Sequence, residues 1–276
     1  MKNLIKRTIT GIIYIGFIIG AIIWGFYGVF ILSLIFTGFA IAEFMTMVNG
    51  SDAYSKSIIT LDVVGGLLMS AFIAFIGINP KLSVIFFCLW ILWFLSRMIT
   101  ELYLKNHNSI KNISTSLMSQ IYIAFPLSLL TLIDGYSGAI LMLMFILIWL
   151  NDTGAFIFGS LFGKHRLFPR VSPKKSWEGF FGGLIFTIGT AVGAYYVFPG
   201  HYGMFPWWGL LIFGIIVTIM STWGDLIESL MKRSVGVKDS GNILPGHGGI
   251  LDRIDSLLIV APATVLLFLI MALYFY

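Results

Sequence analysis

The sequence predicts an all-α, polytopic integral membrane protein. Of its 276 residues 58% are hydrophobic and only 11% are charged, whereas a soluble domain carries about 25% charged residues. The apolar runs are long and continuous, unlike the short alternating segments of a membrane β-barrel. Helices are the expected element because they satisfy their own backbone hydrogen bonds in lipid.

The apolar runs predict about nine transmembrane helices, at about 20 apolar residues per span. The first run follows a basic segment at residues 1–7 and is too long for a signal peptide, so we expect a retained helix. Turn signals at 49–52, 79–80 and 134–136 separate neighbouring runs. The expected extents are 8–26, 28–48, 57–78, 82–99, 116–134, 137–158, 178–198, 206–228 and 253–275.

The sequence shows no internal repeat, so we expect one membrane domain with two parts. Residues 1–135 are expected to be N-terminal transmembrane helices that act as a scaffold and give lipid access. Residues 136–276 are expected to be C-terminal transmembrane helices that carry a catalytic site on the cytoplasmic side, because the polar motifs gather there.

The distribution of basic residues predicts a cytoplasmic N-terminus. With nine alternating spans, only Lys81 of the 17 Lys and Arg residues falls outside, as the positive-inside rule favours. A multi-pass protein of a bacterial inner membrane is therefore expected. The same bias, with anionic lipid headgroups, accounts for most of the net charge of +5, so no nucleic-acid partner is predicted.

Most acidic residues are predicted to lie at the cytoplasmic ends of the helices. Glu43 and Asp62 are each expected to pair with an interfacial Lys or Arg. Asp252 and Asp255 are three residues apart, so on a helix they share one face at the mouth of the last span. Carboxylates there are costly unless a partner balances them, and a metal ion is the expected partner.

The last polar stretch, residues 229–255, combines Lys and Arg with the glycine-rich run Gly246-His247-Gly248-Gly249. Cations, exposed backbone N–H groups and a following helix N-terminus suit phosphate oxygens. The neighbouring carboxylates suit Mg²⁺, which binds a few carboxylates together with substrate phosphates. Taken singly, the Lys and Arg residues are also explained by positive-inside topology.

A second polar segment, residues 172–179, precedes an apolar run. Ser172-Pro173 is expected to start a helix with Lys174 and Lys175 in its first turn. Cations at that position oppose the helix dipole, which indicates that they are held for a ligand. The alternative is an interfacial anchor formed with Trp177. Asn151-Asp152-Thr153 is a weaker signal, which a polar kink between helices also explains.

The stretch from Ser229 to Asp255 resembles the signature of the phosphatidate cytidylyltransferases, also called CDP-diacylglycerol synthases. Residues 151–153 and 172–179 resemble other polar segments of that family, so the similarity covers the chain from about residue 145 onward. The resemblance implies that CTP and phosphatidate react to give CDP-diacylglycerol and pyrophosphate with Mg²⁺, and it leaves a second cation open. It also implies a homodimer embedded in membrane lipid.

The resemblance also assigns roles to individual residues. The expected metal ligands are Asp225, Asp252, Asp255 and Asp152, and the expected catalytic group is Asp225, Asp252, Asp255, Lys238 and His247. The expected substrate- and phosphate-binding residues are Ser172, Lys174, Lys175, Ser229, Lys232, Arg233, Gly248, Gly249 and Arg253.

Three alternatives stay open. A CDP-alcohol phosphotransferase needs D-x₂-D-G-x₂-A-R, but Ser256 follows Asp255 here and the later Ala-Arg pair is absent. A lipid kinase of related architecture, such as a CTP-dependent one, would be distinguished by its nucleotide preference. An ion-coupled transporter would place acids and broken helices near the bilayer midplane, whereas these acids are predicted at one face.

Overall fold

The computed structural model describes residues 2–50, 56–104, 108–241, 243 and 248–275. The chain divides into two compact units, which are described separately. The first unit contains residues up to 135 together with 235–254, and the second contains 136–234 together with 255–276. The segment 235–254 therefore belongs to the same unit as the N-terminal helices.

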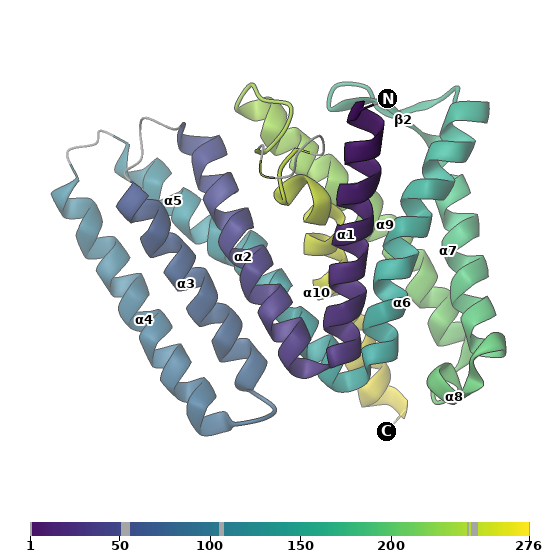
Figure 1. Cartoon of the computed structure of the whole chain (residues 1–276), viewed down its shortest axis with the longest axis horizontal. Helices are drawn as coiled ribbons and strands as arrows, with labels where there is room; N and C mark the ends of the chain where they lie inside the picture. Colours follow the sequence, from purple (N-terminus) through teal and green to yellow (C-terminus); the bar gives the residue numbers. More distant parts are fainter. Residues whose placement is uncertain (1, 51–55, 105–107, 242, 244–247, 276) are drawn as a thin grey trace. The chain divides into compact units, whose positions relative to one another are not determined.

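The first unit contains α1 (Lys2–Trp24), α2 (Phe26–Asn49), α3 (Lys56–Phe75), α4 (Pro80–Tyr103), α5 (Ser109–Ser119) and the π-helix η1 (Gln120–Ala124). Helices α2, α3 and α4 lie side by side, with α3 in the middle (Figure 1). The α1–α2 turn uses Gly25 at φ 81°, a left-handed conformation that glycine adopts without strain. Asn79, in the predicted turn before α4, caps this helix, because its side chain accepts from the Leu82 N–H at 3.2 Å.

A buried polar network ties α3, α4 and α5 of the first unit. The Arg97 guanidinium is fully buried between two carboxylates, with Nη1 at 2.9 Å from Glu101 and Nε at 3.4 Å from Asp62. Ser116 donates to Asp62 at 2.6 Å, and Asn112 donates to Glu101 at 2.7 Å. The prediction that Asp62 pairs with a basic residue is confirmed, although this pair is buried and not interfacial.

The second unit contains α6 (Phe125–Phe162) from Tyr136 onward, β1 (Arg166–Phe168), β2 (Ser172–Ser176), α7 (Trp177–Val197), α8 (Pro199–Tyr202), α9 (Trp207–Ser234) and α10 (Leu251–Phe275) from Asp255 onward. Thr187 and Thr218 share a 2.6 Å hydrogen bond between α7 and α9. Tyr202 donates to the Ala139 carbonyl, which attaches α8 to α6.

Seven helical stretches among the described residues are long and apolar enough to cross a membrane. A polytopic, helical membrane protein is therefore confirmed, while the count of nine stays a prediction. One difference is α1, whose apolar part, Thr8–Trp24, is short. The other is Ser109–Phe162, where two helices were expected on either side of residues 134–136. Those residues are helical, and only Ser137 departs from helical geometry, at φ −165° and ψ 112°.

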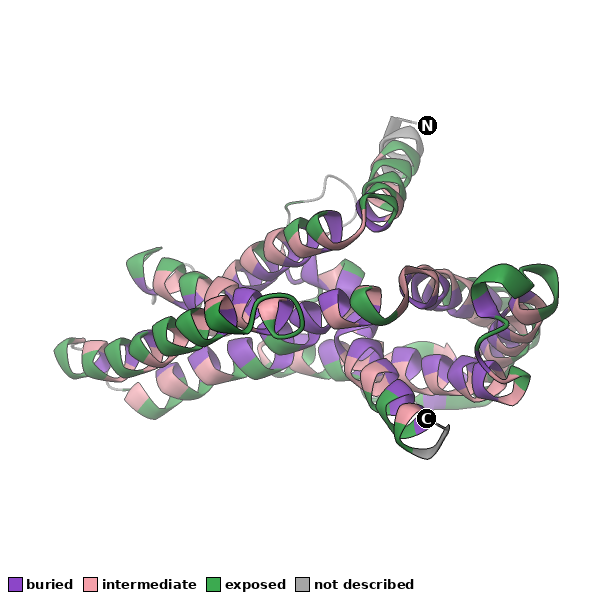
Figure 2. Ribbon diagram, turned by 90° about the horizontal axis from the view of Figure 1, so that it is seen from below, coloured by how far each residue is buried: buried purple, intermediate pink, exposed green. Residues whose placement is uncertain are grey.

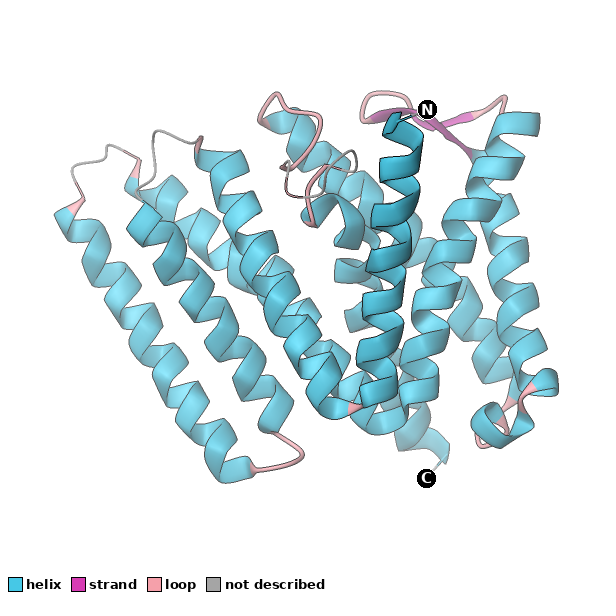
Figure 3. Ribbon diagram, viewed as in Figure 1, coloured by secondary structure: helices cyan, strands magenta, loops and turns pink. Residues whose placement is uncertain are grey.

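Two local predictions near the polar segments are wrong. Residues 172–176 form a strand and not the start of a helix, and they pair antiparallel with β1 (Figure 3). Pairing with β1 holds this segment extended, and Ser176 caps α7 instead by accepting from the Gly179 N–H at 3.2 Å. Helix α9 also continues to Ser234, past the end of its apolar run at about residue 228.

Buried residues form stripes along the helices, with exposed residues on other faces (Figure 2). Many of the exposed residues are large and apolar. Only 17% of the apolar window of α4 is buried inside the protein. Such a helix would be unstable in water, but lipid solvates its outer face as well as a protein interior does. The burial pattern is therefore the one expected of helices that face hydrocarbon.

Candidate active site

Small residues bring the end of α6 against the start of α7 in the second unit. A Cβ atom on Gly154 would lie 2.8 Å from the Gly182 carbonyl oxygen, and one on Gly179 would lie 2.8 Å from the Ala155 carbonyl oxygen. Neither position therefore accepts a side chain without moving backbone. This contact fixes the polar residues at the end of α6 beside the strand that leads into α7.

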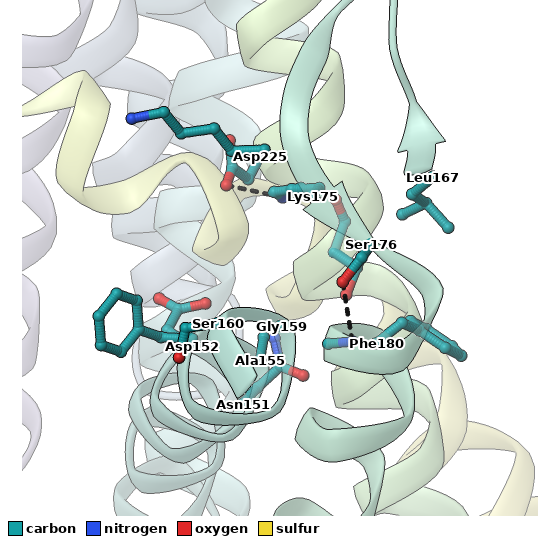
Figure 4. Close-up of a pocket in the computed structure, with 14 residues that line it drawn as sticks. Asn151, Asp152, Ala155, Gly159, Ser160, Leu167, Lys175, Ser176, Phe180 and Asp225 are labelled. Carbon is teal, nitrogen blue, oxygen red and sulfur yellow. Dashed lines mark hydrogen bonds and ion pairs between the residues drawn. The ribbon is translucent and has the colours of Figure 1, made fainter. Parts of the chain in front are cut away.

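A pocket of about 430 Å³ opens where these helices meet β2 and α9 (Figure 4). Its lining combines four charged residues, Asp152, Lys174, Lys175 and Asp225, with polar and apolar ones. An amphipathic pocket of this kind suits a molecule with an anionic head and an apolar body. The remaining lining residues are Asn151, Ala155, Phe156, Gly159, Ser160, Leu167, Ser176, Gly179, Phe180 and Thr222.

Lys175 and Asp225 point toward each other across this pocket (Figure 4). The Lys175 Nζ lies 2.7 Å from Asp225 Oδ2 and 3.3 Å from the Thr222 carbonyl oxygen. The other oxygen, Oδ1, accepts from the Ser229 hydroxyl at 3.1 Å. Both side chains remain partly accessible, so an incoming anion can reach Lys175 and an incoming cation can reach Asp225.

Further carboxylates surround Asp255 on neighbouring helices of the second unit. Asp255 interacts electrostatically with Asp225, Glu228 and Asp152. Hydrogen bonds fix the helices that carry them, because Asn151 on α6 donates to the Ser221 hydroxyl and Ser256 on α10 donates to the Ser221 carbonyl. Gly224 allows this approach, since a Cβ there would lie 2.9 Å from the Asp255 carbonyl oxygen.

The donor chemistry of this carboxylate group fits a hard divalent cation. Asp152, Asp225 and Asp255 supply only oxygen ligands, which Mg²⁺ prefers, and the Lys175 ammonium already contacts Asp225. Among the residues that the structure describes, however, no three Asp, Glu, His or Cys side chains converge closely enough to hold a metal ion. The metal ligands therefore stay a prediction.

A different polar centre lies in the first unit, around Glu43 of α2. Its carboxylate is buried and accepts three hydrogen bonds from the segment 235–254. Oε1 accepts from the Ile250 N–H at 3.0 Å, and Oε2 accepts from the Leu251 N–H at 2.9 Å and the Ser240 hydroxyl at 3.3 Å. The prediction that Glu43 pairs with an interfacial Lys or Arg is wrong, because the N–H groups at the start of α10 attract its charge instead.

The Asp252 carboxylate also accepts hydrogen bonds from the backbone of this segment. Its Oδ2 accepts from the Gly249 N–H at 2.8 Å and from the Ser240 N–H at 3.0 Å. Gly248 has φ 83°, and a Cβ there would lie 2.7 Å from Oδ2. The glycines at 248 and 249 therefore allow carboxylates to approach the backbone closely. Oδ2 thus already accepts two hydrogen bonds, and the metal role of Asp252 stays a prediction.

The structure separates the predicted site residues into two groups. Asp152, Ser172, Lys174, Lys175, Asp225, Ser229, Lys232, Arg233 and Asp255 lie in the second unit, and Lys238, Gly248, Gly249, Asp252 and Arg253 lie in the first. His247 lies outside the described residues. Ser229, Lys232 and Arg233 belong to the last turns of α9 and not to a loop. Lys232 is buried and forms a 2.7 Å ion pair with Glu228.

The sequence did not predict the roles of Glu43, Ser176, Phe156 and Phe180 in these centres. Glu43 lies about 200 positions before its partners, and a single acid in an apolar run carries no local signal for them. Ser176 does carry a signal for a helix start, because serine is a favoured N-cap residue. Ser172-Pro173 carries a stronger one, because proline is favoured at the first helical position. Phe156 and Phe180, which line the pocket, belong to apolar runs without distinguishing features.

The chain is similar in sequence to known proteins. Residues 5–271 match the model of the cytidylyltransferase family. Phosphatidate cytidylyltransferases of Staphylococcus haemolyticus, Staphylococcus epidermidis RP62A and Staphylococcus aureus COL are 45%, 42% and 40% identical to the chain over 160, 158 and 158 residues. Each match spans 57% of this chain and 60% of the relative. Because the family model covers nearly all of the sequence, the chain belongs to the cytidylyltransferase family.

Proposed function

We propose that the protein is a phosphatidate cytidylyltransferase, which transfers CMP from CTP to phosphatidate. A phosphate oxygen of phosphatidate attacks the α-phosphorus of CTP, the bond from that phosphorus to the bridging oxygen of the β-phosphate breaks, and pyrophosphate leaves. The products are CDP-diacylglycerol and pyrophosphate. The three staphylococcal relatives carry this name, which supports the proposal.

The amphipathic pocket of the second unit is the observation that carries the proposal. Its cations, Lys174 and Lys175, suit a phosphate group, and its apolar wall of Ala155, Phe156 and Phe180 suits the glycerol end of acyl chains. A phosphate monoester is already an anionic nucleophile, so the protein needs to supply little general-base catalysis. Positioning and charge neutralisation are the main demands of such a transfer.

The residues of the pocket divide these tasks. Lys175 neutralises negative charge on a bound phosphate from its position beside Asp225, and Lys174 adds a second cation at the rim. Asp225 and Asp255, with Asp152 beside them, would hold Mg²⁺, which when bound neutralises charge on the triphosphate. Asp252 is a further proposed ligand. Lys238, His247 and Arg253 keep their proposed roles in catalysis or phosphate binding.

The surroundings of the reaction belong to the proposal as well. We expect a bacterial inner-membrane protein with a cytoplasmic N-terminus and a site that faces the cytoplasm, because CTP arrives from water and basic residues favour that side. Phosphatidate would reach the pocket laterally from the leaflet. A homodimer is expected from the family, and a nucleic-acid partner is not expected.

A pyrophosphate-release assay on the purified full chain in detergent tests the proposal. Release should require CTP, Mg²⁺ and phosphatidate together, and it should stop when any one is omitted. Replacement of CTP by ATP or GTP should also stop it. Release that persists without phosphatidate, or a folded protein that gives no release, would refute the assignment. CDP-diacylglycerol with small alcohols would then test a CDP-alcohol phosphotransferase.

A further inference from the structure

The connection between α6 and α7 is a two-faced hairpin, which we define as residues 164–175. It contains five Lys and Arg residues and no Asp or Glu. Leu167 and Val171 are buried against Leu226 of α9 and form its inner face. A two-stranded hairpin is only marginally stable alone, so this apolar contact holds it in place.

The outer face of the hairpin presents cations to solvent. Lys164, Arg166, Arg170 and Lys174 are all exposed, and none of them forms an ion pair with another described residue. Phe168, between them in the sequence, is 44% exposed. The nearest acid along the chain, Glu178, is engaged with His165, whose Nδ1 lies 2.6 Å from Oε1. One carboxylate therefore lies beside four exposed cations, and this face keeps a net positive charge.

The hairpin occupies the membrane boundary because it joins two apolar helices that are long enough to cross a bilayer. Figure 3 shows the two strands beyond the ends of α6 and α7. Exposed Lys and Arg beside an exposed aromatic side chain are typical of protein surfaces at the headgroup level. Trp177, at the start of α7, is also partly exposed and adds a second aromatic side chain at this level.

We propose that the hairpin is a docking surface for the headgroups of anionic phospholipids in the bilayer. Charge complementarity selects this partner, since a cationic face without acids attracts phosphodiester and phosphomonoester headgroups and gains nothing from zwitterionic ones. Lys174 lies on the hairpin and also lines the pocket. The surface therefore leads into the pocket, and under the proposed function it concentrates phosphatidate there.

The test uses electron spin resonance of spin-labelled lipids with the full chain in phosphatidylcholine vesicles. The fraction of motionally restricted label is compared for phosphatidate, phosphatidylglycerol and phosphatidylcholine. The wild type should prefer both anionic lipids, and high salt should weaken this preference. The double variant Arg166→Gln/Arg170→Gln should lower it about tenfold, since each cation near an anionic surface contributes up to about fivefold. Neither arginine lines the pocket.

Two further variants keep the result interpretable. Lys81→Gln removes one exposed cation from the start of α4 and should leave the preference unchanged. Arg166→Lys/Arg170→Lys keeps the charge and should retain the preference, which separates charge from loss of the bond that Arg166 donates to the Lys174 carbonyl. An unchanged preference in the Gln variant, or an equal loss in Lys81→Gln, would overturn the proposal.

This readout does not depend on turnover. If the proposed reaction fails but the lipid preference and its loss persist, the docking surface stands without the enzyme assignment. If both hold, the Gln variant should raise the KM for phosphatidate several-fold, expressed as mole fraction in the membrane. The KM for CTP and kcat should not change. A change in the KM for CTP alone would show that the hairpin binds nucleotide and would overturn the proposal.

Discussion

The segment of residues 235–250 and the hairpin of residues 164–175 are both polar connections between apolar helices. The charged side chains around them have different roles, because those at the first bind the protein backbone and those of the second are mostly exposed. In the first, buried Glu43 and partly buried Asp252 accept hydrogen bonds from backbone N–H groups. In the hairpin, strand pairing engages the backbone while four of the five basic side chains are exposed. Carboxylates therefore hold the backbone of one connection in place, whereas the cations of the other remain available to bind a ligand.

This difference separates structural charges from functional ones. A buried carboxylate that satisfies several backbone donors is costly to remove, because each unmet buried donor costs about 1–3 kcal/mol. An exposed cation that contacts only solvent can be removed with little effect on folding. Mutations should therefore affect stability around Glu43 and affect ligands around the hairpin and its pocket.

The largest effect is expected for Glu43→Ala. Loss of this carboxylate leaves the Ile250 and Leu251 N–H groups and the Ser240 hydroxyl without their acceptor, so unfolding should become easier by about 3 kcal/mol or more. Unfolding by sodium dodecyl sulfate in mixed micelles would measure the free energy, and limited proteolysis would report opening of residues 235–250. Glu43→Gln has almost the same size, but its amide cannot accept at both positions. Wild-type stability in Glu43→Gln would show that the negative charge is not needed.

A second large effect is expected for Asp255→Asn, but on turnover alone. This change removes one carboxylate of the group that includes Asp225 and Asp152, so turnover should fall by roughly 100-fold or more if the group holds Mg²⁺. Pyrophosphate release would measure it. Asp134→Asn, on α6 and outside the pocket lining, is the matched control and should keep its activity. Near-normal turnover in Asp255→Asn would remove this residue from the proposed metal ligands.

Comparison of Lys175→Met with Lys174→Met tests whether an ion-paired lysine and an exposed lysine of the pocket contribute differently to activity. Lys175 is fixed 2.7 Å from Asp225, whereas Lys174 is exposed at the rim. We expect kcat/KM for phosphatidate to fall about tenfold further in Lys175→Met, since an ordered and partly desolvated cation interacts more strongly with a phosphate. Lys175→Arg should restore part of the loss. Equal losses in both Met variants would show that only the total charge matters.

The smallest effect is expected for Ser176→Ala. It removes the acceptor for the Gly179 N–H and should destabilise the start of α7 by about 1 kcal/mol. Thermal unfolding in detergent would detect this change. Ser234→Ala, at the exposed end of α9, removes a hydroxyl that donates only to the Met231 carbonyl, so it should change stability much less. Equal shifts would exclude capping as the role of Ser176.

The sequence by itself determined the membrane class, the positions of most helices and the polar motifs. These features follow from local composition, because an apolar run of sufficient length must form a helix to satisfy its backbone in lipid. The prediction from composition was wrong where a helix continues past the end of its apolar run. Helix α9 has 28 residues, about 42 Å, and so exceeds the hydrocarbon core by about two turns. The composition of its polar end therefore predicts a loop where the structure has helix.

Only the tertiary structure decided which polar residues lie together. The hairpin depends on the contact of Leu167 and Val171 with Leu226, and the buried position of Glu43 depends on donors about 200 residues later in the chain. The ion pair of Lys175 with Asp225 likewise joins a strand to a distant helix. Such contacts depend on side chains that packing brings together from remote parts of the sequence, and no local pattern encodes them. The sequence therefore indicated which chemistry is present, while packing determined which charges support the fold and which face a ligand.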